Sequence, residues 1–247
     1  MSISASDLKA YQAANMPETD VATTGGAIAT AGLVEFTDVA ANDDLEALSD
    51  SAGDTMNLTL TGRSAAGAIV SETKALTGVT PIIFGTLGIV ERFLKGVLAS
   101  GPAGTITIRR SVAGATVATI PPAKTSVRRL FYDSASEVGS TTRYEKAFMK
   151  NEHATLTLNN AALKLTADPA ATIRIGAAPS VDDSATVANR KTAPASVTFV
   201  DDGVSQSVPG GALAAGAAIG VWAEMVRGAG AAAIKNTFTV ELSGTTV

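Results

Sequence analysis

Hydrophobic and polar residues alternate in short stretches along most of the chain. In residues 56–61, Met-Asn-Leu-Thr-Leu-Thr, every second residue is apolar, which is typical of a half-buried β-strand. Glycine, proline, asparagine and aspartate cluster between such stretches and predict turns. Beyond residue 55, the pattern predicts strands at residues 56–61, 68–73, 89–98, 105–110, 116–120, 127–132, 143–150, 154–158, 162–166, 172–176, 197–200, 218–226 and 237–242.

No helix is expected among these strands, because the alanine-rich residues 212–218 are interrupted and flanked by glycines. The pattern therefore predicts an all-β fold with two β-sandwich domains, immunoglobulin-like or jelly-roll-like, at residues 55–135 and 141–247. The segment 133–140, Asp-Ser-Ala-Ser-Glu-Val-Gly-Ser, is expected to connect them. Residues 1–54 show little periodicity, so we expect an extended N-terminal arm with one strand near residues 33–37.

Composition narrows the possible classes of protein. The 247 residues are 46% hydrophobic but only 4% aromatic, so alanine, valine, leucine and isoleucine must fill the cores. The chain contains no cysteine, which excludes disulfides, thiolate metal sites and cysteine nucleophiles. The first eight residues lack a basic segment followed by an apolar one, so no secretory signal is expected. No uninterrupted apolar run reaches about 18 residues, so no membrane partner is expected.

Charge is unevenly distributed along the chain. Residues 1–62 carry ten acidic residues and one lysine, whereas residues 63–129 carry nine basic residues and two acidic ones. One interpretation is a solvated acidic segment beside a domain whose strands carry basic residues on outward faces. The alternative is complementarity between copies, in which the acidic arm contacts the basic face of the next subunit. The predicted subunit-interface residues are Arg109, Arg110, Arg128, Arg129, Trp222, Asp43 and Asp44.

The same arginine pairs are the best candidates for nucleic-acid contacts. The chain is acidic overall, with a net charge of −4, and aromatic residues are not interleaved with the basic ones. Nucleic acid is therefore not an expected partner.

Candidate catalytic and metal-binding residues are few. His153 is the only histidine and is interpreted as an exposed or half-buried loop residue. No Gly-x-Ser-x-Gly motif supports a serine hydrolase, and zinc normally requires several histidine or cysteine ligands. Calcium could use the oxygens of residues 42–44, 182–183 or 201–202. Turn formation is the favoured reading of these clusters, because adjacent aspartates on an extended backbone point in opposite directions.

Two further classes of small-molecule site receive little support. Glycoside hydrolysis needs paired carboxylates and usually stacking aromatics, but Trp222 lies in the apolar residues 219–222 and is interpreted as a core residue or an interface plug. No phosphate-binding Gly-x-x-x-x-Gly-Lys-[Ser/Thr] motif occurs. The sequence therefore predicts no catalytic, cofactor-binding or metal-binding residues, no cofactor and no small-molecule substrate. A non-enzymatic protein is expected.

Several segments resemble proteins of tailed bacteriophages. Residues 148–158, Phe-Met-Lys-Asn-Glu-His-Ala-Thr-Leu-Thr-Leu, resemble the opening of β-sandwich domains in tail, neck and capsid accessory proteins. Residues 189–194 and 213–222 are similar to later strands of that domain, and residues 237–244 to its closing strand. In the first half, residues 60–73 are similar to hairpins in the same class of phage protein.

This resemblance implies a structural component of the virion, assembled in the cytoplasm of the host bacterium. We expect an accessory protein present in multiple copies in the tail or neck, with itself and other virion proteins as partners. A capsid decoration protein on the phage head is the alternative. From other classes, a bacterial surface or carbohydrate-binding module and a particle-borne hydrolase would share the β-rich composition, but they predict exposed aromatics or paired acids in a groove.

Overall fold

The computed structural model describes residues 2–35, 38–39, 41–131, 140–168, 171–230 and 238–246. These residues form β-strands joined by turns, with only two three-residue 3₁₀ turns, η1 (Ala5–Asp7) and η2 (Pro209–Gly211). The predicted all-β class is confirmed. The immunoglobulin-like or jelly-roll-like form of the domains stays a prediction.

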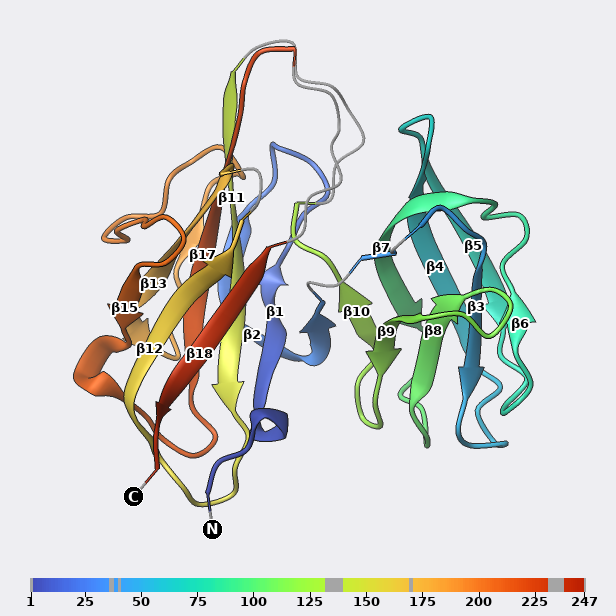
Figure 1. Ribbon diagram of the computed structural model, residues 1–247, viewed down its shortest axis with the longest axis horizontal. Helices are drawn as coiled ribbons and strands as arrows, with labels where there is room; N and C mark the ends of the chain where they lie inside the picture. Colours follow the sequence, from blue (N-terminus) through green and yellow to red (C-terminus); the bar gives the residue numbers. More distant parts are fainter. Residues whose placement is uncertain are drawn as a thin grey trace. The chain divides into compact units, whose positions relative to one another are not determined.

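The chain divides into two compact units (Figure 1). Unit 1 comprises Met1–Ala29 and Ser136–Val247, and unit 2 comprises Thr30–Ala135. The division after Ala135 falls in the segment predicted to connect two domains, of which residues 132–139 lie outside the described residues. Unit 2 is continuous in sequence, whereas unit 1 is built from both ends of the chain.

Unit 1 contains two layers of strands. The first has the order β13-β17-β11-β1-β2, with β14 also paired to β2, and the second has the order β15-β12-β16, with β18 paired to β12. Figure 1 shows β12 and β18 crossing in front of β11 and β17. The strands are β1 (Leu8–Asn15), β2 (Thr24–Val34, which continues into unit 2), β11 (Thr141–Asn151), β12 (Leu158–Ala167), β13 (Ile173–Val181), β14 (Thr186–Val187), β15 (Ser205–Ser207), β16 (Ala212–Leu213), β17 (Ala218–Arg227) and β18 (Thr239–Thr245).

The central pair of unit 1 is β11 with β17. They run antiparallel in one unbroken register from Thr141 opposite Arg227 to Lys150 opposite Ala218. Most residues of both strands are buried, which means that both faces of this pair are covered. Charged side chains on β11 are consequently placed in the interior.

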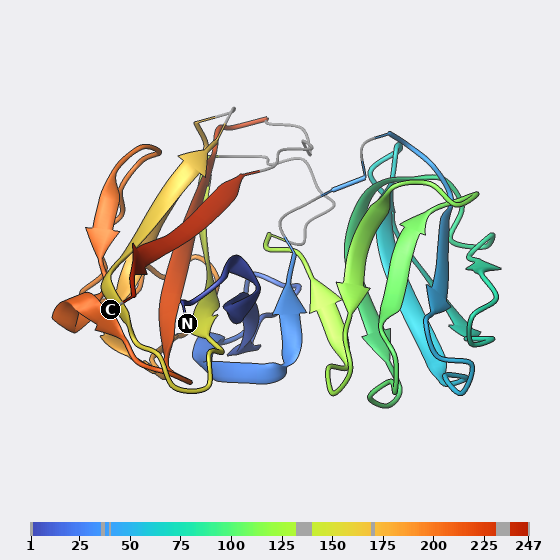
Figure 2. The same ribbon diagram turned by 60° about the horizontal axis from the view of Figure 1, so that its bottom comes forward.

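Unit 2 has two sheets that share one hydrophobic core, the arrangement of a β-sandwich (Figure 2). One sheet continues from the end of β2 in the order β10-β7-β4-β5, and the other has the order β6-β3-β8-β9. The core draws apolar side chains from both sheets, among them Leu45, Leu60, Phe93 and Ile108, each fully buried. The strands are β3 (Leu45–Ser49), β4 (Asn57–Ser64), β5 (Ile69–Ala75), β6 (Ile82–Ile83), β7 (Val90–Leu98), β8 (Ile106–Arg110), β9 (Thr116–Ile120) and β10 (Ser126–Arg128).

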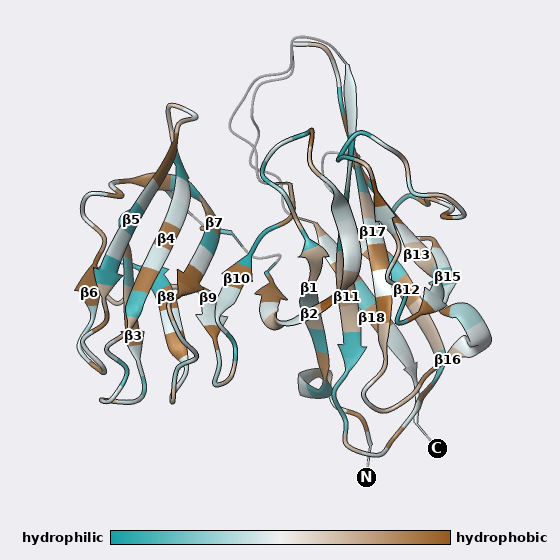
Figure 3. Ribbon diagram, turned by 180° about the vertical axis from the view of Figure 1, so that it is seen from behind, coloured by the Kyte–Doolittle hydropathy of each residue, from teal (hydrophilic) through white to brown (hydrophobic). Residues whose placement is uncertain are grey.

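Strand β4 illustrates how the sequence pattern produces this sheet. Its leucines, Leu58 and Leu60, are fully buried, while the intervening threonines lie on the other face. Figure 3 shows the alternation of hydrophobic and polar positions along this strand. On the polar face, the hydroxyls of Thr59 and Thr73 are hydrogen-bonded at 2.8 Å across β4 and β5. Such cross-strand pairs add to the stability supplied by the buried face.

Four predictions about the strands are wrong. Residues 1–54 do not form an extended arm, because β1, β2 and β3 all lie in this range and pair within the two units. Residues 154–157 form a bend rather than a strand, and β12 begins at Leu158. In residues 197–200 only Val200 pairs, in an isolated bridge with Ile175. The strand predicted at 127–132 is too long, because β10 ends at Arg128. Four residues of predicted strands lie outside the described residues: Phe36, Thr37, Tyr132 and Thr237.

Candidate functional site

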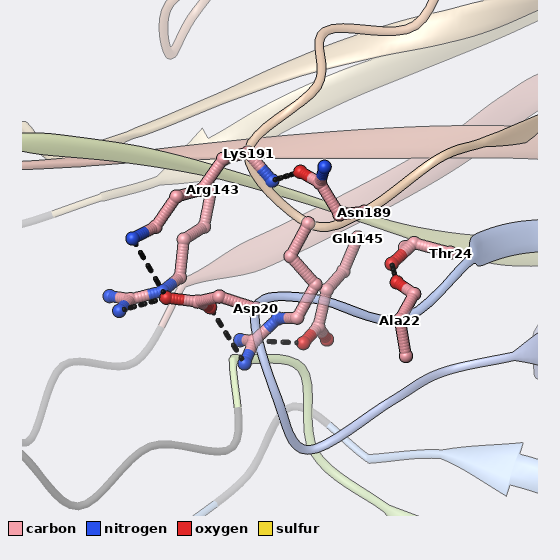
Figure 4. A network of polar contacts seen from close by, with 8 residues as sticks. Asp20, Ala22, Thr24, Arg143, Glu145, Asn189 and Lys191 are labelled. Carbon is pink, nitrogen blue, oxygen red and sulfur yellow. Dashed lines mark hydrogen bonds and ion pairs between the residues drawn. The ribbon is translucent and has the colours of Figure 1, made fainter.

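The most extensive polar cluster of unit 1 surrounds Asp20, on the loop between β1 and β2 (Figure 4). Nε of Arg143 donates to Oδ1 of Asp20 at 2.7 Å, and a terminal guanidinium nitrogen of Arg143 donates to Oδ2 at 2.8 Å. Lys191 and Arg190 approach the same carboxylate at 3.2 and 3.6 Å. Arg190 also pairs with Glu145 at 2.8 Å. One carboxylate therefore joins a loop, strand β11 and the segment after β14.

Burial makes this cluster a structural element. Glu145 is 0% exposed and Arg190 1% exposed. The hydrogen bond from Arg143, helped by Lys191, lowers the pKa of Asp20 to about 2 although burial opposes the shift. Asp20 is thus ionised at neutral pH and is bound by cations of its own chain. It is not available as a general acid.

Lys146 lies on the opposite face of β11 from Glu145 and is also fully buried. Its Nζ donates to Oδ2 of Asp183 at 2.6 Å, to the Asp183 carbonyl at 2.8 Å and to the Gly26 carbonyl at 3.1 Å. The ammonium also lies over the rings of Phe148 and Trp222, 4.7 and 5.7 Å from their centroids. Burial lowers the pKa of Lys146, although the contact with Asp183 opposes the shift. An ammonium with three good acceptors holds this region together rather than acting as a nucleophile.

In unit 2, the acidic and basic segments of the sequence pair with each other. Arg109 binds Glu46 at 2.6 Å between β8 and β3, and Arg110 binds Asp43 with two hydrogen bonds of 3.0 and 2.7 Å. The acidic residues near the N-terminus and the basic residues that follow therefore pair within one chain, which accounts for part of the uneven charge distribution. The hypothesis that it reflects pairing between copies is therefore not needed for these residues.

The structure corrects the predicted position of the second arginine pair. Arg128 and Arg129 are 6% and 3% exposed, so their predicted outward orientation is wrong. Arg129 and Arg92 lie 3.5 and 3.4 Å from the buried carboxylate of Asp38. Val127 and Arg128, which are consecutive residues of β10 and point to opposite faces, are both buried, and the sequence pattern does not reveal this.

The remaining interface candidates differ in exposure. Trp222 is 1% exposed and packs inside unit 1, which agrees with its interpretation as a core residue and not with an interface plug. Asp43 and Asp44 are half-buried, and the Asp44 carbonyl accepts the amide of Ser111 at 2.9 Å. None of the seven predicted residues offers a fully exposed side chain.

His153 has a structural position in the turn between β11 and β12. Its Nδ1 accepts the amide protons of Thr155 at 3.2 Å and Leu156 at 3.0 Å. Nδ1 therefore acts as a hydrogen-bond acceptor that fixes the turn. The side chain replaces the backbone partners that a strand would have supplied to residues 155 and 156.

The aspartate clusters also serve turns. Asp54 accepts the Ser49 hydroxyl at 2.6 Å and the amides of Ala103 and Gly104 at 2.8 and 3.0 Å. Burial would raise the pKa of Asp54, but these hydrogen bonds outweigh it and lower the pKa. Asp182 accepts the amide of Ala218 at 2.9 Å. Within the described ranges, no group of three or more His, Cys, Asp or Glu residues is placed to hold a metal ion.

The charged residues that pair with one another around β11 are missing from the sequence-based prediction. They are Asp20, Arg143, Glu145, Lys146, Asp183 and Arg190. A signal was present in the predicted strand 143–150, where charged residues occupy both faces. A strand of that kind must either be exposed or have a partner for each charge. The partners are 37 to 123 residues away in the sequence, so the local pattern does not identify them.

The described residues also present apolar side chains and a strand edge to solvent. Single apolar side chains are exposed, with Val21 at 85% and Val112 at 83% on loops. Strand β5 lies at the end of its sheet.

No helix in the described part of the chain is long and apolar enough to span a membrane. Comparisons with family models, curated proteins and solved structures find no match for this chain.

Proposed function

We propose that this protein is a non-enzymatic structural component of a tailed-bacteriophage virion, assembled in the host bacterial cytoplasm. In this proposal it is an accessory protein present in multiple copies in the tail or neck. Its partners are further copies of itself and other virion proteins. Capsid decoration is the alternative location.

The observation that carries the proposal is the use of the charged side chains. Asp20, Lys146, Asp54 and Glu46 are each engaged by groups of the same chain. These bonds fix loops to strands and create rigid units, while apolar side chains and a strand edge face solvent. A protein whose role is to present stable surfaces to neighbours needs this combination.

The sequence resemblance supports the phage class specifically. Residues 148–158 span the end of β11, the turn built on His153 and the start of β12. This part of the chain resembles the opening of virion β-sandwich domains. In an assembly, weak contacts repeated over many copies supply avidity, so no single large interface is required.

Mass spectrometry of purified particles tests the proposal. Phage from a host that carries this gene are banded on a density gradient, and the peptides of this chain are quantified against the major capsid protein. We expect peptides of this chain at several copies per particle, and immunogold labelling at the tail or neck. Particles from a deletion strain, with and without a complementing plasmid, provide the matched control.

Two results would change the conclusion. If the chain is absent from particles of the complemented strain, it is not a virion component and the proposal is wrong. If gold labels the head surface instead, the virion role stands and capsid decoration replaces the tail or neck location.

A further inference from the structure

Strand β5 pairs on one side only. It is the last strand in the order β10-β7-β4-β5, and its seven residues from Ile69 to Ala75 pair with β4 in an unbroken register. In the described part of the chain, no strand pairs with its other side. An edge of this length is a template for another strand.

The hydrogen bonds at the two ends of the hairpin identify the backbone groups on the free side. The amide of Ser64 donates to the Ala68 carbonyl at 2.9 Å, and that of Leu76 donates to the Met56 carbonyl at 3.0 Å. Hydrogen-bonded pairs alternate along an antiparallel ladder, so the even-numbered residues of β5 bond to β4. The amide and carbonyl groups of the odd-numbered residues point away from the sheet. These residues are Ile69, Ser71, Thr73 and Ala75.

The side chains along this edge do not obstruct a neighbour. The four odd-numbered residues are exposed, uncharged and mostly small or β-branched. On the other face, Lys74 and Glu72 are 3.3 Å apart, and Glu72 accepts the Leu87 amide at 2.8 Å. Inward-pointing charges often protect an edge from pairing. Here they neutralise each other and are held by their own chain.

Charge selects one register for pairing with a second copy. Antiparallel pairing must place an odd-numbered residue opposite an odd-numbered residue, because only these carry outward backbone groups. A two-fold axis at residue 72 would place Glu72 opposite itself, and an axis at Lys74 would oppose two lysines. An axis at Thr73 places Glu72 opposite Lys74 of the second copy on both sides, and opposite charges at such positions attract.

We infer that β5 pairs antiparallel with β5 of a second copy around a two-fold axis through Thr73. Ser71 then bonds to Ala75 of the second copy, and Thr73 to its own equivalent. This inference rests on the proposed function, since it names one contact by which copies associate. The contact is small and belongs to the weak, repeated class that multivalent assemblies use.

Cysteine crosslinking tests the register directly, because the full-length chain has no native cysteine. In the proposed dimer the Cα atoms of the two Thr73 residues are about 5.5 Å apart, within the range of about 4.4–6.8 Å that a disulfide spans. Thr73→Cys should therefore form a covalent dimer under mild oxidation. Ser71→Cys is the matched control, since it is on the same exposed face but lies about 14 Å along the strand from its equivalent.

We expect at least about tenfold more dimer from Thr73→Cys than from Ser71→Cys on a non-reducing gel, reversed by reductant. Equal or faster crosslinking of Ser71→Cys would overturn the register, and no crosslinking of either variant would overturn the contact. Thermal melts of both variants provide the check that each is folded.

A second measurement uses no cysteine. Sedimentation equilibrium should show that Lys74→Glu weakens dimerisation about tenfold, because it places two carboxylates opposite each other. The double variant E72K/K74E restores opposite charges within and between copies and should recover wild-type dimerisation. Failure of the double variant to recover, with its fold intact, contradicts the charge-selected register.

The outcomes separate this inference from the proposed function. If the chain is present in particles but Thr73→Cys does not crosslink preferentially, the β5 contact is wrong and the virion role stands. If crosslinking succeeds but particles lack the chain, the self-association is real and the virion role is wrong.

Discussion

At the scale of single residues, the chain uses buried and half-buried charged side chains to join distant segments. Asp20, Lys146 and Asp54 each join segments far apart in sequence through several hydrogen bonds. Transferring a charge from water to the protein interior raises the free energy of the folded state, and the charge's partners offset this penalty only when the geometry is good. Such connectors therefore specify which segments meet more than they add net stability. Removing one partner should be costly, and two substitutions measure this.

Asp20→Asn should reduce stability more at neutral pH than at low pH. The pKa of Asp20 is lowered from 3.8 to about 2, so the folded state favours the ionised form. That contribution amounts to at most about 2 kcal/mol, is nearly complete above about pH 4, falls to about a third of its full value at pH 2.5, and vanishes only below the folded-state pKa. Urea unfolding of both proteins at pH 7 and at pH 2.5 checks this. Asp202→Asn, at an exposed position, is the control, and an equal loss at both pH values would contradict the prediction.

Lys146→Met should destabilise unit 1 by about 2–4 kcal/mol. Methionine fills similar volume beside Phe148 and Trp222, but the carboxylate of Asp183 and the Gly26 carbonyl lose their donor. Chemical denaturation monitored by the fluorescence of Trp222, the only tryptophan, reports on this region. The half-buried strand lysine Lys164 provides the comparison: Lys164→Met should change stability by less than about 1 kcal/mol. A result for Lys146→Met as small as that would show that the ion pair is dispensable.

At the scale of strands and turns, alternation predicts the strands that have one buried face. The prediction for residues 116–120 coincides with β9, and that for residues 105–110 differs from β8 by one residue. Strand β1 escapes prediction because Ala10, Ala13 and Ala14 carry little strand preference, and pairing with its two sheet neighbours, β11 and β2, fixes its conformation. The strand prediction for residues 154–157 is wrong for the opposite reason. The pattern is typical of a strand, but the His153 side chain accepts the backbone amides of the turn.

The candidate site is less predictable than the strands, because its contacts join distant parts of the sequence. Local pattern shows that Arg143 and Glu145 share a face of a strand, but not that Asp20 and Arg190 meet them there. The uneven charge distribution was a visible signal. It was interpreted either as a solvated acidic segment beside outward basic residues or as pairing between copies, whereas the fold places Glu46 and Arg109 on neighbouring strands of one unit.

A substitution at Gly25 tests how tightly strand β2 packs against its neighbours. Its φ is +94°, and an added Cβ would lie 2.8 Å from the Trp222 ring and 2.9 Å from the Ala185 carbonyl. Gly25→Ala should therefore lower the free energy of unfolding by about 3 kcal/mol, through backbone strain and overpacking. Gly228→Ala, where nothing lies within 4 Å, should change it by less than about 1 kcal/mol. Similar melting temperatures for the two variants would contradict the prediction.

At the scale of the whole molecule, unit 2 is an insertion between two parts of unit 1. The chain leaves unit 1 after Ala29 and returns at Ser136. The buried residues of the main core of unit 2 lie between Val39 and Val127, and Leu33, which packs against this core, also belongs to unit 2. Unit 1 needs both ends, because β1 pairs with β11 and β14 pairs with β2. The two units should consequently differ in their ability to fold when separated.

A fragment of residues 30–135 should fold alone. It contains the end of β2 and strands β3 to β10, with both sheets and the shared core, and about 100 residues suffice for an independent domain. We expect a single cooperative urea transition and a dispersed amide NMR spectrum. The same fragment with Leu60→Asp, which buries a charge in the core, should be unfolded and serves as the control. Residues 136–247 without 1–29 should not fold, because β11 then loses β1 and Arg143 loses Asp20. An unfolded 30–135 fragment would mean that this core is insufficient and that unit 2 depends on the surrounding chain.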